Sequence, residues 1–124
     1  MLFKGLQHIG IPTEDYEVSL AFYKQLGFEL INFEMNQGQK AGFLELGGLV
    51  LEIWEAPAAE STGAIHHIAL DTDDIEGAFA AISRLSVQLI DTEIQQLPFW
   101  EKGIKYFNFY GPNRETIEIC QKNQ

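Results

Sequence analysis

The chain has 124 residues, a length expected of one domain, and its 46% hydrophobic content is enough for a core. Its eight Lys and Arg residues are scattered along the chain against eighteen acidic residues, and a net charge of −10 argues against nucleic-acid binding. A cytoplasmic protein with no membrane partner is expected, because no apolar run approaches the ~20 residues of a membrane helix, no signal-peptide pattern is present, and the single cysteine cannot form an internal disulfide.

The first half of the chain predicts one strand, one helix and three further strands, in that order. The first strand is expected at about residues 6–12, and the acidic pair Glu14-Asp15 suits the N-terminus of the helix that follows. The pair Gly47-Gly48 predicts a tight hairpin between the last two strands. Helical spacing predicts a buried face of Tyr16, Leu20, Tyr23 and Leu26, and the three later strands are expected at about 28–34, 39–46 and 49–55.

The second half repeats this pattern. Residues 65–70 match residues 6–11 at a separation of 59 positions, and the match persists for about 25 residues. The ends of the halves match at a separation of 66, with Phe43 on Phe109, so seven extra residues are expected within about 96–103. The second half is expected to hold a strand at about 65–72, a helix opened by Asp73-Asp74 with Ile75, Phe79, Ile82 and Leu85 buried, and strands at about 87–93, 104–110 and 115–121.

This repeat predicts the α+β class and one domain, 1–124, built from two modules. The modules are expected at about residues 1–58 and 64–124, joined by the small-residue stretch 56–63.

Strand alternation predicts that two His and two Glu residues each point to the face of the sheet opposite the aliphatic residues. Aliphatic neighbours occupy alternate positions around each of them, so the four side chains oppose the faces that pack under the helices. Singly, such residues are more often structural or solvated. Together, related by the repeat, they suit one divalent metal ion, with Ni, Zn, Co, Mn and Fe all open. The four predicted metal ligands are His8, Glu52, His67 and Glu118.

Two neighbouring residues are interpreted differently. His66 is expected to be structural, because the repeat places Gln7 at the equivalent position. Cys120 falls on the ligand face beyond Glu118, where it either lines the site or forms a buried free thiol. Of the strand aromatics, only Trp54 shares the face of Glu52 by its spacing, and the other candidates for cleft or core are Phe43, Tyr106, Phe107 and Phe109.

Several segments together resemble the glyoxalase/bleomycin-resistance/dioxygenase, or vicinal oxygen chelate, superfamily, and the resemblance covers essentially the whole chain. It implies a glyoxalase-like fold, in which two tandem βαβββ modules form curled mixed sheets around a metal cleft. It also implies a small-molecule substrate and a homodimer, with the site inside one chain or shared between two. The segments are His8–Pro12, Ser19–Phe28, Leu51–Trp54, His67–Leu70 and Gly111–Ile119.

Carried over by the resemblance, the metal-ligand positions of glyoxalase I fall on the four predicted ligands. Each of these positions holds a His or a Glu residue in this sequence. This set resembles glyoxalase I and the epimerase branch, whereas the fosfomycin-modifying relatives usually lack a ligand at the Glu52 position. Bacterial glyoxalase I carries an Arg four residues after the first His and an Asn four residues after the first Glu, and both help to hold glutathione. Pro12 and Ala56 stand at those positions here, which argues against glutathione as a co-substrate.

The resemblance implies a metal-dependent lyase, isomerase or epimerase that transfers a proton next to a metal-chelated carbonyl. Glu118 is the first choice as the base, with Glu52 as its symmetric partner. Two alternatives stay open: a non-catalytic drug-binding module of the bleomycin-resistance type, and a metal-dependent dioxygenase. The stretch Pro98-Phe99-Trp100 is a candidate lid or dimer contact, or a rigid surface loop.

Overall fold

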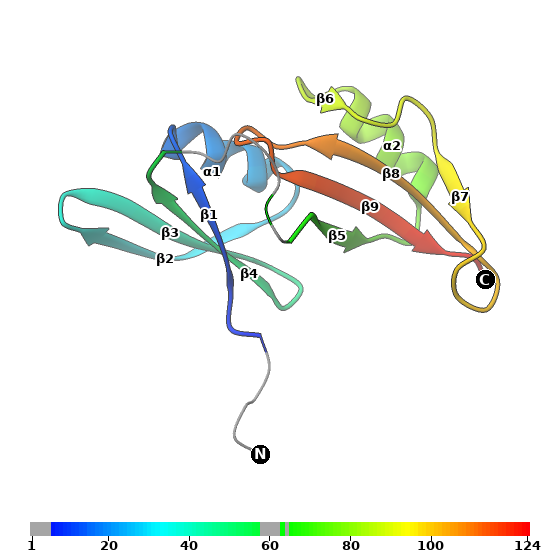
Figure 1. Ribbon diagram of the computed structural model, residues 1–124, viewed down its shortest axis with the longest axis horizontal. Helices are drawn as coiled ribbons and strands as arrows, with labels where there is room; N and C mark the ends of the chain where they lie inside the picture. Colours follow the sequence, from blue (N-terminus) through cyan, green and yellow to red (C-terminus); the bar gives the residue numbers. More distant parts are fainter. Residues whose placement is uncertain (1–5, 58–62, 64) are drawn as a thin grey trace, which may run out of the picture. The chain divides into compact units, whose positions relative to one another are not determined.

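The computed structural model describes residues 6–57, 63 and 65–124 and forms two compact units, Met1–Ala59 and Glu60–Gln124 (Figure 1). The predicted boundary stretch 56–63 falls mainly on residues 58–62, which lie outside the described residues. Among the helices of the described ranges, none is long and apolar enough to cross a membrane.

The first unit holds one helix on a four-stranded mixed sheet. The strands lie in the order β1-β4-β3-β2, with β1 parallel to β4 and the other pairs antiparallel. This is the strand, helix and three strands that the sequence predicts, and the class is α+β. The elements are β1 (Ile9–Thr13), α1 (Tyr16–Gln25), β2 (Glu29–Asn36), β3 (Gln39–Leu46) and β4 (Leu49–Glu55).

Helix α1 covers one face of this sheet. The Asp15 carboxylate accepts a hydrogen bond from the Val18 amide at 3.1 Å, which caps the N-terminus of the helix. A buried hydrogen bond of 2.8 Å between the Thr13 and Ser19 hydroxyls joins β1 to the helix. Because the helix closes this face, the opposite face of the sheet is the one left for a site. The side chains that form the core are Tyr16, Leu20, Tyr23, Leu44, Leu51 and Ile53.

The second unit repeats this plan with a five-stranded sheet and helix α2. The strand order is β5-β9-β8-β6, β7 also pairs with β8, and β5 lies parallel to β9. The Gln121 side chain joins β9 to the helix, since it accepts from the Ile75 amide and donates to the Asp73 carbonyl, each at 2.9 Å. The elements are β5 (His67–Asp71), α2 (Ile75–Ser83), β6 (Gln88–Leu89), β7 (Gln95–Leu97), β8 (Ile104–Tyr110) and β9 (Thr116–Lys122).

One predicted strand differs from the structure. The strand expected at about 87–93 is only two residues long, and β7 forms within the predicted insertion instead. The cause is local, because the amides of Ile90 and Asp91 both donate to the Asn108 carbonyl, which interrupts regular pairing. Pairing with β8 resumes only where Gln95 lies opposite Tyr106.

Gly42 in β3 lies directly under the Tyr16 ring, and we expect Gly42→Ala to destabilise the fold. A Cβ atom there would collide with the Tyr16 hydroxyl oxygen and lie 3.2 Å from a methyl carbon of Leu30. Tyr16 is buried, so its ring has little room to yield. Crowding of this kind costs about 1–3 kcal/mol, which urea denaturation would measure.

Gly63→Ala is the matched control for this substitution. Among the described residues, none places an atom within 4 Å of a Cβ atom on Gly63, so the free energy of unfolding should barely change. Equal urea midpoints for the two variants would show that Tyr16 does not pack closely against Gly42.

Candidate metal centre

In the first unit, His8 and Glu52 lie side by side. His8 immediately precedes β1, and the parallel register of β1 with β4 places Gly10 opposite Glu52. This brings the His8 Nε2 atom to 3.3 Å from the Glu52 Oε1 atom. Both side chains are partly exposed, so the pair can be reached from outside the unit.

In the second unit, His67 and Glu118 form the same arrangement. His67 is the first residue of β5, and Ala69 lies opposite Glu118 in the parallel register of β5 with β9. The His67 Nε2 atom is 3.3 Å from the Glu118 Oε1 atom. The repeat in the sequence therefore produces the same His–Glu pair twice, once in each unit.

The two pairs lie on the sheet faces turned away from the helices. Leu51 and Ile53 flank Glu52 and are fully buried, and Ile117 and Ile119 flank Glu118 and are also buried. Alternation then directs both carboxylates to the opposite face. Over the described ranges, no group of three or more His, Cys, Asp or Glu side chains is arranged to hold a metal ion.

The residue before each histidine contacts the other nitrogen of that imidazole. Gln7 Oε1 lies within hydrogen-bonding distance of His8 Nδ1, and the Nδ1 atoms of His66 and His67 are 3.0 Å apart. When His8 and His67 carry their protons on Nδ1, their Nε2 lone pairs are left free toward the glutamates. The sequence signal for this shared contact is the equivalent position of Gln7 and His66 in the repeat.

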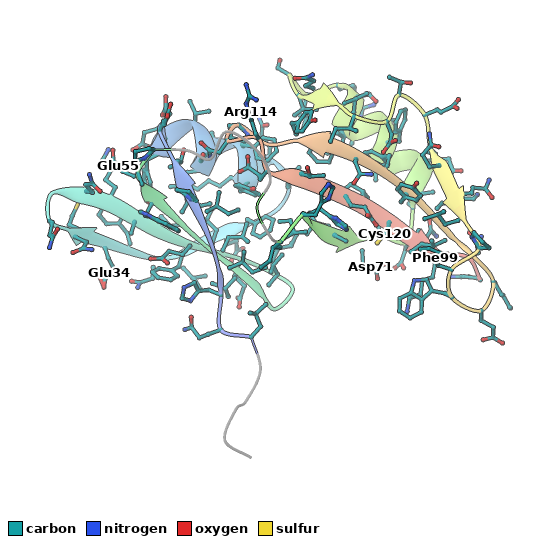
Figure 2. All side chains as sticks on the ribbon, viewed as in Figure 1. Glu34, Glu55, Asp71, Phe99, Arg114 and Cys120 are labelled. Atoms are coloured by element: carbon teal, nitrogen blue, oxygen red, sulfur yellow. The ribbon has the colours of Figure 1, made fainter. Side chains whose placement is uncertain are left out.

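Cys120, labelled in Figure 2, follows Glu118 by two residues in β9 and therefore lies on the same face of the strand, as its spacing predicts. Its thiol points to the Leu70 carbonyl oxygen at 3.7 Å. Burial raises the pKa of this thiol, and the negative charges of Glu118 and Asp71 raise it further. The neutral thiol is therefore favoured, which suits a packing role better than a nucleophilic one.

The sequence predicts that Phe43 and Phe109 occupy equivalent positions of the two units, and this prediction is wrong by one residue. Phe43 lies directly across from Glu52, whereas the residue across from Glu118 is Asn108. Phe109 instead pairs with Ile117 and is completely buried in the core. The turn between β8 and β9 is longer than the Gly47-Gly48 turn, which shifts the register of one strand against the repeat.

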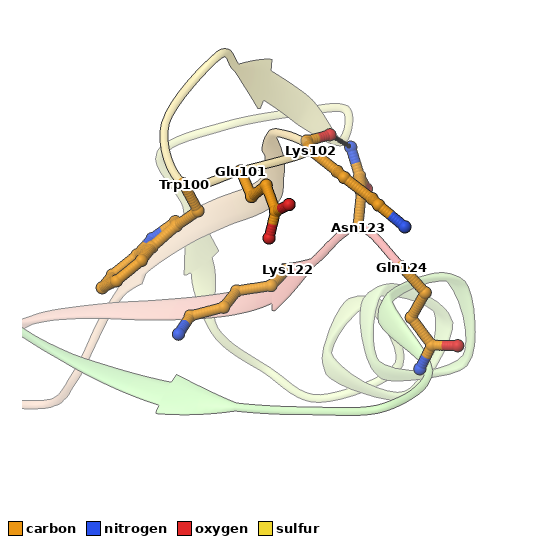
Figure 3. A pocket seen from close by; sticks show the side chains of 6 residues that line it. All are labelled: Trp100, Glu101, Lys102, Lys122, Asn123 and Gln124. Carbon is orange, nitrogen blue, oxygen red and sulfur yellow. Dashed lines mark hydrogen bonds between the residues drawn. The ribbon is translucent and has the colours of Figure 1, made fainter.

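The loop after β7 forms a pocket that includes neither His67 nor Glu118. The pocket has a volume of about 330 Å³ and is drawn in Figure 3. The Lys122 ammonium lies 3.7 Å from the centre of the Trp100 ring. Phe99 and Trp100 of this loop are both exposed. The lining residues are Trp100, Glu101, Lys102, Lys122, Asn123 and Gln124.

Known proteins resemble this chain in both sequence and structure. The chain is 33% identical over 132 residues to the uncharacterized protein YwbC of Bacillus subtilis (strain 168), covering 96% of this chain and 98% of YwbC. The glyoxalase family protein from Enterococcus faecalis superposes with a TM-score of 0.79 at 22% identity, covering 97% of this chain and 99% of that one. The fosfomycin resistance protein FosX from Listeria monocytogenes, complexed with Mn(II) and sulfate, also gives 0.79, at 19% identity over 98% and 95% of the chains.

These structural matches agree with the duplicated strand, helix and three-strand plan of the two units. A family model described as the Glyoxalase/Bleomycin resistance protein/Dioxygenase superfamily matches residues 5–119, which is nearly the whole chain. The chain therefore belongs to the Glyoxalase/Bleomycin resistance protein/Dioxygenase superfamily.

Proposed function

We propose that four side chains together bind one divalent metal ion, and that the protein catalyses proton transfer next to a carbonyl bound there. The observation that carries the proposal is the His–Glu pair that occurs once in each unit with the same 3.3 Å separation. Nickel, zinc, cobalt, manganese and iron all accept such donors, and the FosX protein with the similar fold was solved with Mn(II). The proposed ligands are His8, Glu52, His67 and Glu118.

The geometry of each pair fits two adjacent ligands of one ion. Nitrogen and oxygen donors lie about 2.0–2.2 Å from a zinc ion, which separates neighbouring donors by about 2.8–3.1 Å at octahedral angles and about 3.3–3.6 Å at tetrahedral angles. The measured 3.3 Å falls at the lower end of the tetrahedral range for both the His8–Glu52 and the His67–Glu118 pair. Four donors require both units, whether from one chain or from two, and we propose a homodimer as the working form.

The proposed chemistry depends on a carboxylate beside the ion. When bound, a divalent ion would polarise the substrate carbonyl and stabilise the charge that develops on its oxygen. Glu118 is the proposed base that removes the carbon-bound proton, and Glu52 is its symmetric counterpart. Return of the proton to the neighbouring carbon gives an isomer, and return to the other face of the same carbon gives an epimer.

The surroundings of Glu118 support its choice as the base. Asn108 lies directly across from it, and both the amide and the side-chain NH2 of Asn108 donate to Asp91 at 2.8 Å. These two bonds hold a polar side chain in a fixed orientation beside Glu118. Neither Pro12 nor Ala56 supplies the cation or amide that would hold glutathione, so the proposed substrate is a small oxygenated molecule alone.

A deuterium-exchange experiment tests this proposal. The protein is loaded with Mn²⁺, Ni²⁺ or Zn²⁺ and incubated in D2O with a panel of 2-oxo and 2-hydroxycarbonyl compounds, and NMR measures loss of the proton next to the carbonyl. We expect exchange in the loaded protein and none after chelation. Bound metal without exchange across the panel would indicate another reaction, such as dioxygen chemistry. Affinity for cationic aromatic drugs without bound metal would indicate a drug-binding module.

Gln7→Leu is expected to weaken metal binding by about 10–100-fold, a typical cost of losing the group that orients a histidine ligand. The substitution removes the oxygen that contacts His8 Nδ1 and changes no proposed ligand. Competition with a chromophoric chelator would measure the affinity. Gln96→Leu, at an exposed position of β7, is the matched control. Equal affinities in the two variants would contradict an orienting role for Gln7.

A further inference from the structure

The two His–Glu pairs have chemically different neighbours at equivalent positions of the repeat. Across the sheet from Glu52 lies Phe43, whereas Asn108 lies across from Glu118. Two residues after each glutamate, the first unit has Trp54 and the second has Cys120. At these two positions the first half carries aromatic residues and the second an amide and a thiol, whereas across from Trp54 lies Ala41 and across from Cys120 lies Tyr106.

In the first unit, two aromatic rings border the pair. The Phe43 ring meets the His8 imidazole edge-on, with ring centroids 5.5 Å apart and an angle of 89° between the planes. The Trp54 indole lies over Gly10, because a Cβ atom on Gly10 would be 2.8 Å from Trp54 Cζ3. The same point is 3.9 Å from Glu52 Oε1, so the indole and the carboxylate border the same glycine.

Because Gly10 has no side chain, the Trp54 indole can lie against it. Any side chain at position 10 would occupy the space of the Trp54 ring, and only a hydrogen atom leaves room for the ring there. In the second unit the corresponding residue is Ala69, which lies opposite Glu118 as Gly10 lies opposite Glu52. The second unit therefore has neither the indole nor the glycine that admits it.

From this difference we infer that Trp54 determines substrate specificity, by contacting an apolar group that the substrate carries beside its metal-binding oxygens. The inference rests on the proposed function and adds the substrate class to it. A partly exposed indole next to a metal-binding carboxylate offers apolar surface that is removed from water when an apolar group covers it. The residue directly across from Glu118 is Asn108, and the aromatic residue on that face, Tyr106 across from Cys120, is a phenol with a polar hydroxyl group.

Two hydroxamates test the inference directly. Acetohydroxamate and benzohydroxamate chelate a metal through the same two neighbouring oxygens, and they differ only in a methyl or a phenyl group. Their affinities for the Mn²⁺-loaded protein are measured by titration calorimetry, together with the affinity for Mn²⁺ itself. We expect benzohydroxamate to bind about 10-fold more tightly or better, as one added apolar group in a fitted site allows. Trp54→Ala should bring the ratio of the benzohydroxamate and acetohydroxamate affinities close to one. It should leave the affinities for acetohydroxamate and for Mn²⁺ within about twofold of those of the unaltered protein.

Two further variants guard against a simple folding defect. Gly10→Ala keeps the indole but displaces it, and should lower the ratio in the same way. Trp100→Ala removes an exposed tryptophan outside the pair and should leave the ratio unchanged. Because the chain has two tryptophans, Trp100→Phe leaves Trp54 as the sole indole, and its fluorescence should respond to benzohydroxamate.

The outcomes separate the two proposals. Normal Mn²⁺ binding with an unchanged hydroxamate ratio in both Trp54→Ala and Gly10→Ala would overturn the specificity role and leave the proposed function standing. A wild-type protein that binds no Mn²⁺, Ni²⁺ or Zn²⁺ would overturn the proposed function, and the specificity role with it.

Discussion

Glu118→Gln should lower the rate of deuterium exchange by about 10²–10⁴-fold, the usual contribution of a positioned general base. Glutamine has nearly the same shape but cannot accept the proton. The fold should persist, because the residues that hold this position are the buried Ile117 and Ile119 on either side and the pairing with Asn108. NMR exchange rates, divided by the metal content of each sample, would measure the effect on chemistry apart from any loss of metal.

Two further variants show whether this loss belongs to the base. Glu93→Gln changes an exposed carboxylate outside the pairs and should exchange at the wild-type rate. Glu52→Gln is expected to reduce metal content while keeping more exchange per bound ion than Glu118→Gln. A metal-loaded Glu118→Gln protein that keeps more than about a tenth of the wild-type rate would refute the role of Glu118 as the base.

Metal binding should raise the melting temperature by on the order of 10 °C when free metal is about 100 times the dissociation constant. Binding to the native state alone contributes about 2.7 kcal/mol under that condition, and each kcal/mol shifts Tm by several degrees in a domain of this size. His8→Ala and His67→Ala should each abolish most of the shift, because each removes one of four proposed ligands. Calorimetric scans with added metal, and again after chelation, would measure it.

The control for this prediction is Glu76→Gln, which removes an exposed carboxylate of helix α2. It should show the full metal-dependent shift. The proposal would be contradicted if the His8→Ala and His67→Ala proteins both shifted as far as this control, because the stabilising ion would then lie elsewhere.

The sequence predicted several strands to the residue. Gln39–Leu46, Leu49–Glu55 and Ile104–Tyr110 coincide with the observed β3, β4 and β8. These segments combine clear alternation with glycine-containing turns, so local patterning and tertiary pairing agree. The same alternation correctly indicated that Glu52 and Glu118 oppose buried aliphatic residues.

Other features depend on pairing between strands that are distant in sequence. The short β6 and the new β7 arise because two amides share the Asn108 carbonyl, an event that composition does not reveal. The one-residue shift that puts Asn108, rather than Phe109, across from Glu118 comes from the length of the second turn. Alignment of the two halves could not detect this shift, because matching residue types favoured Phe43 with Phe109.

The contacts of Gln7 and His66 illustrate a different kind of omission. The two residues occupy equivalent positions of the repeat but differ in type, so the sequence alone indicates no shared role for them. Their shared role follows from position and from an available oxygen or nitrogen atom, which becomes visible only when the distances to His8 and His67 are known.

Elemental analysis of the purified protein and of its His8→Ala and His67→Ala variants tests the four-ligand site most directly. One divalent ion per chain is expected in the unaltered protein, with near-complete loss in either variant, since each His–Glu pair alone supplies only two donors. A full ion per chain retained after either substitution, or no ion in the unaltered protein after incubation with Mn²⁺, Ni²⁺ or Zn²⁺, would contradict the account.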